Sequence, residues 1–226
     1  MRDLILQERF EMEVLHRLNS GRFLDRMLFT GGTMLRLCHG LERFSVDLDF
    51  RLRPEVEPGA YFRVLRGFLE SHYLLTDAAD KFNTLLLELK SPAFPRRLKL
   101  EIRKTGGDSP SELAIAYSVH STLQVLLSVV TLEEMMVSKI HALLERREIR
   151  DAYDMEFLVR RGVFPKAPPD KLRQAANLVR TLPPEDYLVK LSSLLEEKQR
   201  RYYREENFKI LLRVLDDALA SSARDG

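Results

Sequence analysis

The chain of 226 residues contains one cysteine, Cys38, and no tryptophan. A single cysteine excludes an internal disulfide bond and a zinc site built from several cysteines. The five histidines are scattered along the chain without the spacing of metal ligands. We therefore expect a protein of a reducing compartment that has no thiolate metal site.

The sequence also lacks long apolar runs and an excess of charge of one sign. No run approaches the roughly 20 apolar residues of a membrane span, and the first ten residues lack the apolar core of a signal peptide. We therefore expect a cytoplasmic protein. Its 36 lysines and arginines nearly balance 34 acidic residues. This balance excludes a polycation that binds nucleic acid by charge alone, so RNA contacts require local basic clusters.

Hydrophobic residues make up 45% of the chain, enough for one or two modest cores. Before residue 130, hydrophobic periodicity predicts helices at 4–18, 33–38 and 60–75, and strands at 46–52, 82–90, 97–103 and 123–130. Turn-forming residues predict a loop at 105–110. After residue 130, helices are predicted at 131–147, 150–160, 170–180, 184–197 and 205–220. The sequence therefore predicts an α+β half, residues 1–130, and a helical half, residues 131–226.

A glycine pair and an aspartate pair form the most informative motif. Gly31 and Gly32 begin a short amphipathic helix, and the strand that follows carries Asp47 and Asp49 on one face. Two adjacent carboxylates repel each other unless a cation separates them, and hard oxygen ligands suit Mg²⁺, with Mn²⁺ as a substitute. The glycines let backbone N–H groups approach a triphosphate, and the helix adds the positive end of its dipole. The motif predicts a metal-dependent nucleotide site.

A third carboxylate, Glu101, lies on the polar face of the strand predicted at 97–103. If the two strands are neighbours, Glu101 supplies the carboxylate that nucleotidyl transfer needs beside the incoming hydroxyl. The alternative is an ordinary solvated face formed by Lys99, Glu101 and Arg103.

The first helices after residue 130 carry further charged candidates. Lys139 lies among apolar residues, so it either extends to solvent or binds a phosphate as a point charge. Asp151 either caps the next helix or pairs with Arg147 or Arg150. Asp154 lies one turn further along the same face.

The succession GGTMLRL, FSVDLDF, KLEI and SKIHALLERREIRDAYD, between about residues 29 and 158, resembles the AbiEii/AbiGii toxin family of nucleotidyltransferases. The resemblance implies a polymerase-β-like core with a mixed sheet, followed by a helical half. It implies the toxin of a bacterial toxin–antitoxin or abortive-infection module, with a cognate antitoxin as partner. It also implies Mg²⁺-dependent transfer of NMP from an NTP to RNA, the acceptor end of tRNA in characterised relatives.

The resemblance also assigns roles to single residues. The metal ligands would be Asp47, Asp49 and Glu101, with Glu101 also acting as base. The triphosphate contacts would be Gly31, Gly32 and Ser45. A serine of the family motif is Gly32 in this chain, so Thr30 or Thr33 would have to supply the missing hydroxyl. Lys139 would bind phosphate and Asp151 would complete the site.

Arginines and tyrosines gather near the C-terminus, at Arg200, Arg201, Arg204, Tyr202 and Tyr203. Basic residues beside exposed tyrosines predict RNA contacts, through phosphate neutralisation and base stacking. Glutamates in the same segment offer the alternative that these arginines form ion pairs along a solvated helix.

Two other functions compete with nucleotidyl transfer. Glu88 and Lys90, with Asp49, fit the E-x-K pattern of a PD-(D/E)xK nuclease, but this leaves the glycine pair and the RDAYD segment without roles. The third interpretation is a non-catalytic helical protein that binds a partner and whose acids only pair with arginines. Thermal stabilisation by NTP and Mg²⁺ together would favour the nucleotidyltransferase.

Overall fold

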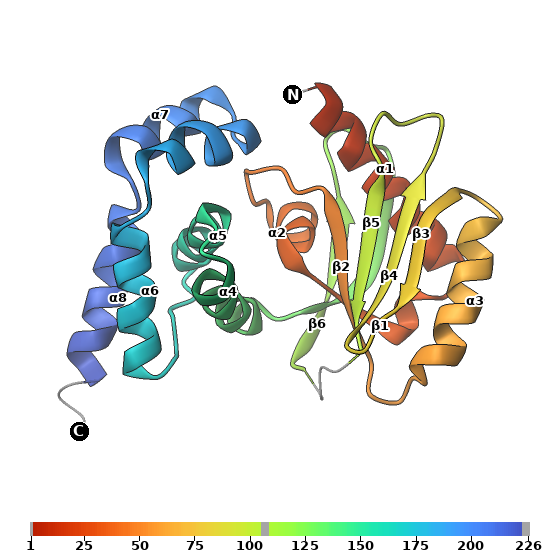
Figure 1. Cartoon of the computed structure of the whole chain (residues 1–226), viewed down its shortest axis with the longest axis horizontal. Helices are drawn as coiled ribbons and strands as arrows, with labels where there is room; N and C mark the ends of the chain where they lie inside the picture. The colour runs from red at the N-terminus through yellow and green to blue at the C-terminus, as the bar shows by residue number, and fades with distance from the viewer. Residues whose placement is uncertain (1, 105–108, 223–226) are drawn as a thin grey trace. The chain divides into compact units, whose positions relative to one another are not determined.

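The computed structural model describes residues 2–104 and 109–222. The chain separates into two compact units, Met1–Thr131 and Leu132–Gly226, which are described one at a time below. Figure 1 shows a sheet with helices in the first unit and helices alone in the second. The predicted α+β fold class is confirmed. Residues 105–108 of the predicted loop lie outside the described residues.

A mixed seven-stranded sheet forms the first unit, in the order β3-β4-β5-β2-β1-β7-β6. Its strands are β1 (Met27–Thr30), β2 (Asp47–Leu52), β3 (Leu74–Asp80), β4 (Thr84–Lys90), β5 (Leu98–Arg103), β6 (Ser111–Tyr117) and β7 (Gln124–Val130). The pairs β2–β5 and β1–β7 are parallel, and the other four pairs are antiparallel. The parallel pair β2–β5 brings the two acidic strands side by side.

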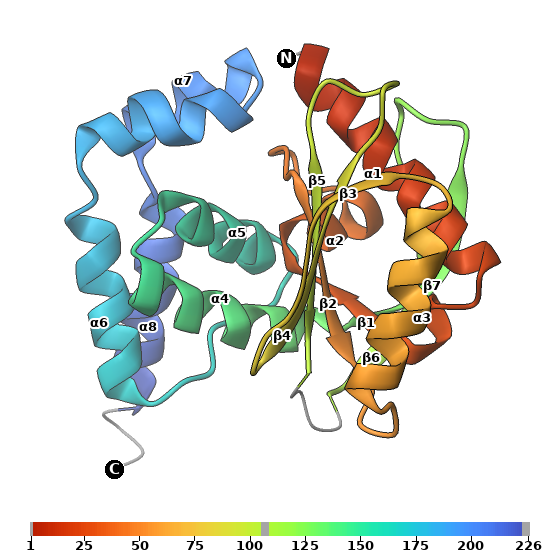
Figure 2. The same cartoon turned by 45° about the vertical axis from the view of Figure 1, so that its right-hand side comes forward.

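The described residues of this unit form three α-helices, α1 (Arg2–Ser20), α2 (Gly31–His39) and α3 (Pro58–Glu70), with a 3₁₀ turn at Leu24–Arg26. Helices α1 and α3 lie on the same side of the sheet in Figures 1 and 2. The Phe10 ring of α1 stacks on Phe94 with centroids 4.6 Å apart and meets Tyr73 edge-on at 5.5 Å. This aromatic cluster anchors α1 to the loops beside the sheet.

The two edge strands of the sheet, β3 and β6, were not predicted. Residues 71–75 were expected to continue a helix, but α3 ends at Glu70 and β3 begins at Leu74. The sequence of β3, LLTDAAD, is rich in residues with low β propensity. In β6 a large apolar side chain faces solvent and a small one faces the core: Leu113 is 70% exposed, while Ala116 is buried. An edge strand has only one neighbour to bury its side chains, so its sequence pattern is weak.

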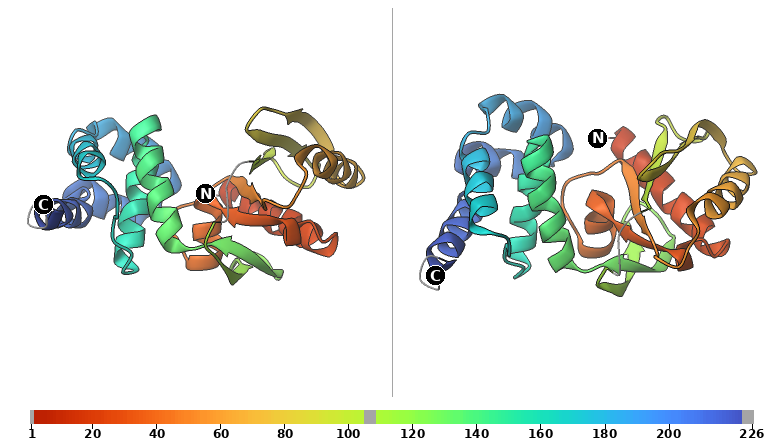
Figure 3. Two further views of the ribbon diagram at one scale, coloured as in Figure 1. Left: turned by 90° about the horizontal axis from the view of Figure 1, so that it is seen from below. Right: turned by 60° about the horizontal axis from the view of Figure 1, so that its bottom comes forward.

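The second unit consists of α4 (Leu132–Arg146), α5 (Ile149–Arg160), α6 (Pro169–Arg180), α7 (Glu197–Glu206) and α8 (Lys209–Ser222). Figure 3 shows these helices from two further directions. The helix predicted at 184–197 is wrong in type, because a π-helical turn at Asp186–Leu191 and a 3₁₀ turn at Ser192–Leu194 replace it. Asn207, with φ of 52°, separates α7 from α8 where one helix was predicted to start at 205.

A buried glutamate, Glu156 of α5, joins three helices of this unit. Its carboxylate accepts hydrogen bonds from the Tyr203 hydroxyl (3.0 Å), the Leu211 N–H (3.2 Å) and Arg160 (2.8 Å). Burial raises the pKa of Glu156, and the hydrogen bonds oppose this increase. Tyr203 is only 3% exposed, so the expectation that it stacks on an RNA base is wrong. Its ring is part of the core.

Candidate functional site

The two acidic strands are neighbours in a register that aligns their carboxylates. Leu48 and Phe50 of β2 are buried, whereas Asp47 and Asp49 on the opposite face are half-buried. Across the parallel pair, Asp49 lies opposite Glu101 and Asp47 lies opposite Lys99. The structure therefore brings Asp47, Asp49 and Glu101 onto one face of two adjacent strands, as the expected site requires.

A lysine that had no predicted role lies among these acids. The Lys99 ammonium is 2.9 Å from Glu101 Oε1. The hydrogen bond to Glu101, together with the charges of Asp47 and Asp49, raises the pKa of Lys99 against the opposing effect of partial burial. The sequence placed Lys99 on the same strand face as Glu101 but gave no sign of which acid it would contact.

The donor atoms of this face suit a hard divalent cation. Within residues 2–104 and 109–222, no three Asp, Glu, His or Cys side chains are gathered closely enough to hold a metal ion as they stand. The available ligands are nevertheless carboxylate oxygens, the ligands that Mg²⁺ prefers. A positive charge, the Lys99 ammonium, already lies among them. The donor atoms are therefore of the kind that Mg²⁺ takes, and the ammonium shows that this face accommodates a positive charge.

The glycine pair lies directly against the acidic strand. Gly31 has φ of +82°, and a Cβ at this position would be 2.8 Å from the Asp49 Cβ. A Cβ on Gly32 would be 2.6 Å from Arg43 Nη2 and 2.9 Å from Ser45 Oγ. Only residues without a side chain let these three groups approach the N-terminus of α2.

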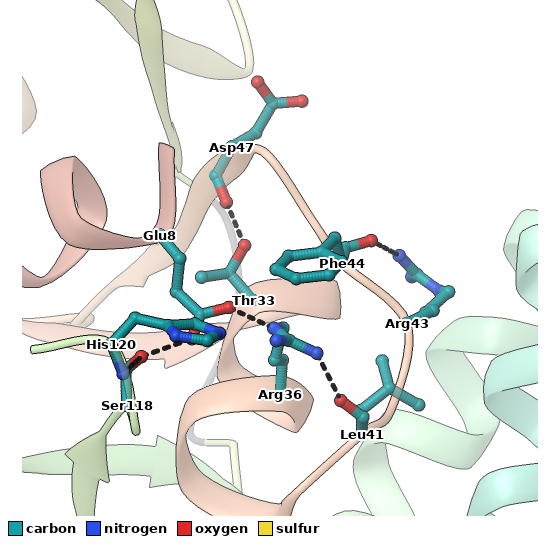
Figure 4. A network of polar contacts seen from close by, with 9 residues as sticks. All are labelled: Glu8, Thr33, Arg36, Leu41, Arg43, Phe44, Asp47, Ser118 and His120. Carbon is teal, nitrogen blue, oxygen red and sulfur yellow. Dashed lines mark hydrogen bonds and ion pairs between the residues drawn. The ribbon is translucent and has the colours of Figure 1, made fainter. Parts of the chain in front are cut away.

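Figure 4 shows how Thr33 and Arg43 hold the segment before β2. Thr33 is fully buried, and its hydroxyl donates to the Asp47 carbonyl oxygen at 2.5 Å. Arg43 is 3% exposed and donates to the Phe44 carbonyl oxygen at 2.9 Å. Thr33 therefore positions Asp47, and its predicted phosphate contact stays a prediction. Arg43 was missed, although its place between the glycine pair and the aspartates was visible in the sequence.

A second row of polar groups supports this segment. Arg36 pairs with Glu8 of α1, donates to the Leu41 carbonyl oxygen at 3.2 Å, and lies 3.9 Å from the centroid of the Phe44 ring. Ser118 also donates to Glu8, as Figure 4 shows. These contacts fix the chain between α2 and β2, and thereby the start of the acidic strand.

One buried acid in α1 has no such partners. Glu11 is fully buried, and neither of its carboxylate oxygens accepts a hydrogen bond from the part of the chain that the structure describes. Burial, the charge of Glu8 and the charge of Asp47 raise its pKa well above the usual value, and Arg36 opposes them. Burial and the neighbouring negative charges therefore disfavour the ionised form of Glu11.

In the second unit the structure brings Lys139 and Asp151 together. The Lys139 ammonium lies 2.7 Å from Asp154 Oδ2 and 3.4 Å from Asp151 Oδ1, and both aspartates are fully buried. Arg146 Nη2 lies 2.9 Å from Asp151 Oδ1. Lys139 is 6% exposed, so it does not extend to solvent. Asp151 is paired as one interpretation expected, but its arginine is Arg146, and the helix N-cap is Glu148.

The nuclease pattern has a different environment. Glu88 lies on β4, and β5 separates it from β2, the strand of Asp49. Its carboxylate accepts hydrogen bonds from the Thr76 hydroxyl (2.5 Å) and from Arg97 (2.9 Å). The Glu88 carboxylate is thus already hydrogen-bonded to two neighbouring side chains.

The fold has counterparts among solved structures. The fold is similar to JHP933 from Helicobacter pylori, with a TM-score of 0.56 and 20% sequence identity over 96% of this chain and 95% of that chain. It is also similar to a second H. pylori structure, provisionally described as a nucleotidyltransferase, with a TM-score of 0.57 and 20% identity over 94% and 96% of the two chains. At this identity the likeness shows the fold alone.

The family follows from the sequence. The family model "Nucleotidyl transferase AbiEii toxin, Type IV TA system" matches residues 13–220. The chain belongs to this family, which confirms the predicted resemblance and implies an antitoxin partner. No match was found among curated proteins. None of the helices in the described ranges is long and apolar enough to span a membrane.

Proposed function

We propose that this toxin transfers a nucleoside monophosphate from an NTP to RNA in a Mg²⁺-dependent reaction. The observation that supports this most strongly is the β2–β5 register, which aligns Asp49 with Glu101 and leaves Asp47 on the same face. This face adjoins the Gly31–Gly32 turn at the N-terminus of α2. A carboxylate face beside a helix N-terminus can serve a metal and a triphosphate together.

Asp47, Asp49 and Glu101 would hold the Mg²⁺. When bound, the ion would neutralise charge that builds up on the phosphate oxygens during transfer. The N–H groups of Gly31 and Gly32 would donate to the triphosphate. Ser45 and Arg43 lie against Gly32, so they would provide a hydroxyl and a guanidinium beside it.

The transfer step forms one bond and breaks one. The oxygen of an RNA hydroxyl attacks the α-phosphorus, the bond from this phosphorus to the pyrophosphate oxygen breaks, and pyrophosphate leaves with the electron pair. Glu101 accepts the proton of the attacking hydroxyl. In the structure its carboxylate is paired with the Lys99 ammonium, at 2.9 Å.

The second unit is proposed to contribute to phosphate and RNA binding. Lys139 and Asp151 would take part through the buried cluster of α4 and α5, where a phosphate must compete with two aspartates for the ammonium. For RNA the candidates are now Arg204, Arg201 and Arg200. Arg201 is paired with Glu205, and Arg200 donates to the Leu195 carbonyl oxygen, which makes Arg204 the strongest of the three.

The function can be tested with each α-labelled NTP, total RNA and a Mg²⁺ titration, followed by sizing of the labelled product. We expect one or more NTPs to label RNA, and we would test the tRNA 3′ end first, using tRNA with intact and with trimmed ends. Asp49→Asn serves as the inactive control. Shortened RNA without incorporated label would support the nuclease instead. Absence of both incorporation and cleavage would leave the non-catalytic interpretation.

A further inference from the structure

The acidic face of the first unit contains its own cation. Lys99 lies opposite Asp47 in the sheet register and its ammonium is 2.9 Å from Glu101 Oε1. We infer that Lys99 is a positioning residue that occupies the electrostatic place of a divalent ion: it holds Glu101 in the metal-free protein and gives up this contact when metal binds. This inference rests on the proposed function, because it concerns the same metal site.

The register of the sheet determines which acids lie next to Lys99. Its neighbours across the two flanking strands are Asp47 on β2 and Glu88 on β4. Glu88 is already bonded to Thr76 and Arg97, so it competes weakly for the ammonium. Lys99 therefore turns to Glu101, two residues along its own strand. The ammonium contacts Glu101 and not Glu88 of the outer strand β4. It therefore lies on the side of the proposed metal ligands.

Charge explains why the ammonium and a metal exclude each other. A lysine and a divalent cation that share the same carboxylates repel each other, so an ion bound to Glu101 weakens the contact of Glu101 with Lys99. The Lys99 side chain is 38% exposed, and its flexible stem lets the ammonium move into water at small cost. The ion pair and the metal are therefore alternative ways of neutralising one face.

The experiment measures metal binding in the absence of nucleotide and RNA. Lys99→Met keeps the apolar stem and removes the charge. We expect the metal-free variant to melt at a lower temperature, because its carboxylates repel each other. In a Mn²⁺ titration followed by EPR, we expect its Kd to be about threefold to tenfold lower than that of the wild type, in line with the loss of one partly exposed ion pair. Its melting temperature should also rise more on addition of Mg²⁺.

Two further variants make the result specific. Arg103→Met removes the same charge from the same strand face, but Arg103 lies opposite Arg51 rather than an acid. It should leave the Mn²⁺ Kd unchanged. Lys99→Arg should restore the wild-type Kd, because the charge returns.

The outcomes separate this inference from the proposed function. If Lys99→Met binds Mn²⁺ as the wild type does or more weakly, or if Arg103→Met tightens binding equally, Lys99 does not compete with the metal. A wild-type protein that binds Mn²⁺ but transfers no nucleotide would contradict the function and leave the inference standing. A wild type that binds no Mn²⁺ would overturn both.

Discussion

Gly31 and Asp49 lie so close together that a Cβ on the glycine would be 2.8 Å from the Asp49 Cβ and 2.9 Å from its Cγ. Gly31 also has φ of +82°, a conformation that L-residues adopt at a cost. The first residue of α2 is thus a glycine for two independent reasons. The contact sets the distance between a helix N-terminus and a carboxylate of the proposed metal site.

Gly31→Ala should therefore lower both stability and activity. We expect the free energy of unfolding to fall by about 2 kcal/mol from backbone strain alone, with more from the clash. Gly67→Ala, in the interior of α3, is the matched control, because a Cβ there has no heavy atom within 4 Å. This control should gain about 0.5–1 kcal/mol. Urea unfolding of both variants checks the prediction, and a Gly31→Ala protein of wild-type stability would contradict the geometry.

The metal ligands can be tested by isosteric substitution. Asp47→Asn and Asp49→Asn should each reduce nucleotidyl transfer by about 100-fold or more, because each replaces a charged oxygen ligand with a neutral one. The metal-free melting temperature should stay the same or rise, since one of several neighbouring like charges is removed. Incorporation of labelled NTP and thermal unfolding without metal measure the two effects. Near-normal transfer by either folded variant would exclude the proposed site.

The acidic strand was predictable because its two faces differ completely. Leu48 and Phe50 are buried while Asp47 and Asp49, which alternate with them, are half-buried, so the alternation of β2 is visible in the sequence. The partner of that strand was not predictable in the same way. Glu101 is some 50 residues from Asp49, and only the pairing of β5 with β2, rather than with another strand, brings the two together. Local patterns contain little information about such long-range pairing.

Errors in the prediction arose where local pattern and burial disagree. The edge strand β6 exposes its large residues and buries Ala116, so its apolar side chains give no sign of the core. Tyr203 was expected on the surface, because arginines and glutamates surround it in the sequence. In the structure it is buried against Glu156, which comes from a helix 47 positions away. Its burial depends on a tertiary contact that helical periodicity does not report.

Glu11 predicts an unusual dependence of stability on pH. Its folded-state pKa is raised well above the usual 4.5, so the folded protein binds this proton more tightly than the unfolded chain does. Its contribution is fully present below the usual pKa and is lost as the pH rises toward the folded-state pKa. Glu11→Gln remains neutral in both states. Its stability relative to wild type should therefore increase by up to about 1.4 kcal/mol per pH unit above 4.5.

Urea unfolding from pH 4 to pH 9 would measure this dependence. Glu145→Gln, at an exposed position of α4, serves as a control and should leave the pH slope of the wild type unchanged. A Glu11→Gln protein with the same slope as wild type would show that Glu11 is ionised in the fold. In that case a partner for its carboxylate must exist.

Variants of the cluster formed by Lys139, Asp151 and Asp154 can separate effects on stability from effects on nucleotide binding. Lys139→Ala removes an ammonium that lies 2.7 Å from the buried Asp154 carboxylate, while Asp151 keeps Arg146, so we expect a loss of about 3–5 kcal/mol. Loss of activity in that variant would thus not reveal a phosphate contact. In the double variant Lys139→Met/Asp154→Asn one charge of each sign disappears, and the pair of Asp151 with Arg146 remains.

The double variant should recover most of the lost stability, because it buries no unpaired carboxylate. If Lys139 binds a phosphate, the affinity for NTP should stay reduced, by about 10-fold or more for a charge-assisted contact. Thermal unfolding and NTP titration with Mg²⁺ measure the two quantities on the same samples. NTP affinity equal to wild type in a stable double variant would assign Lys139 to the junction of α4 and α5 alone. A Lys139→Ala protein as stable as wild type would instead show that the cluster adds little to the fold.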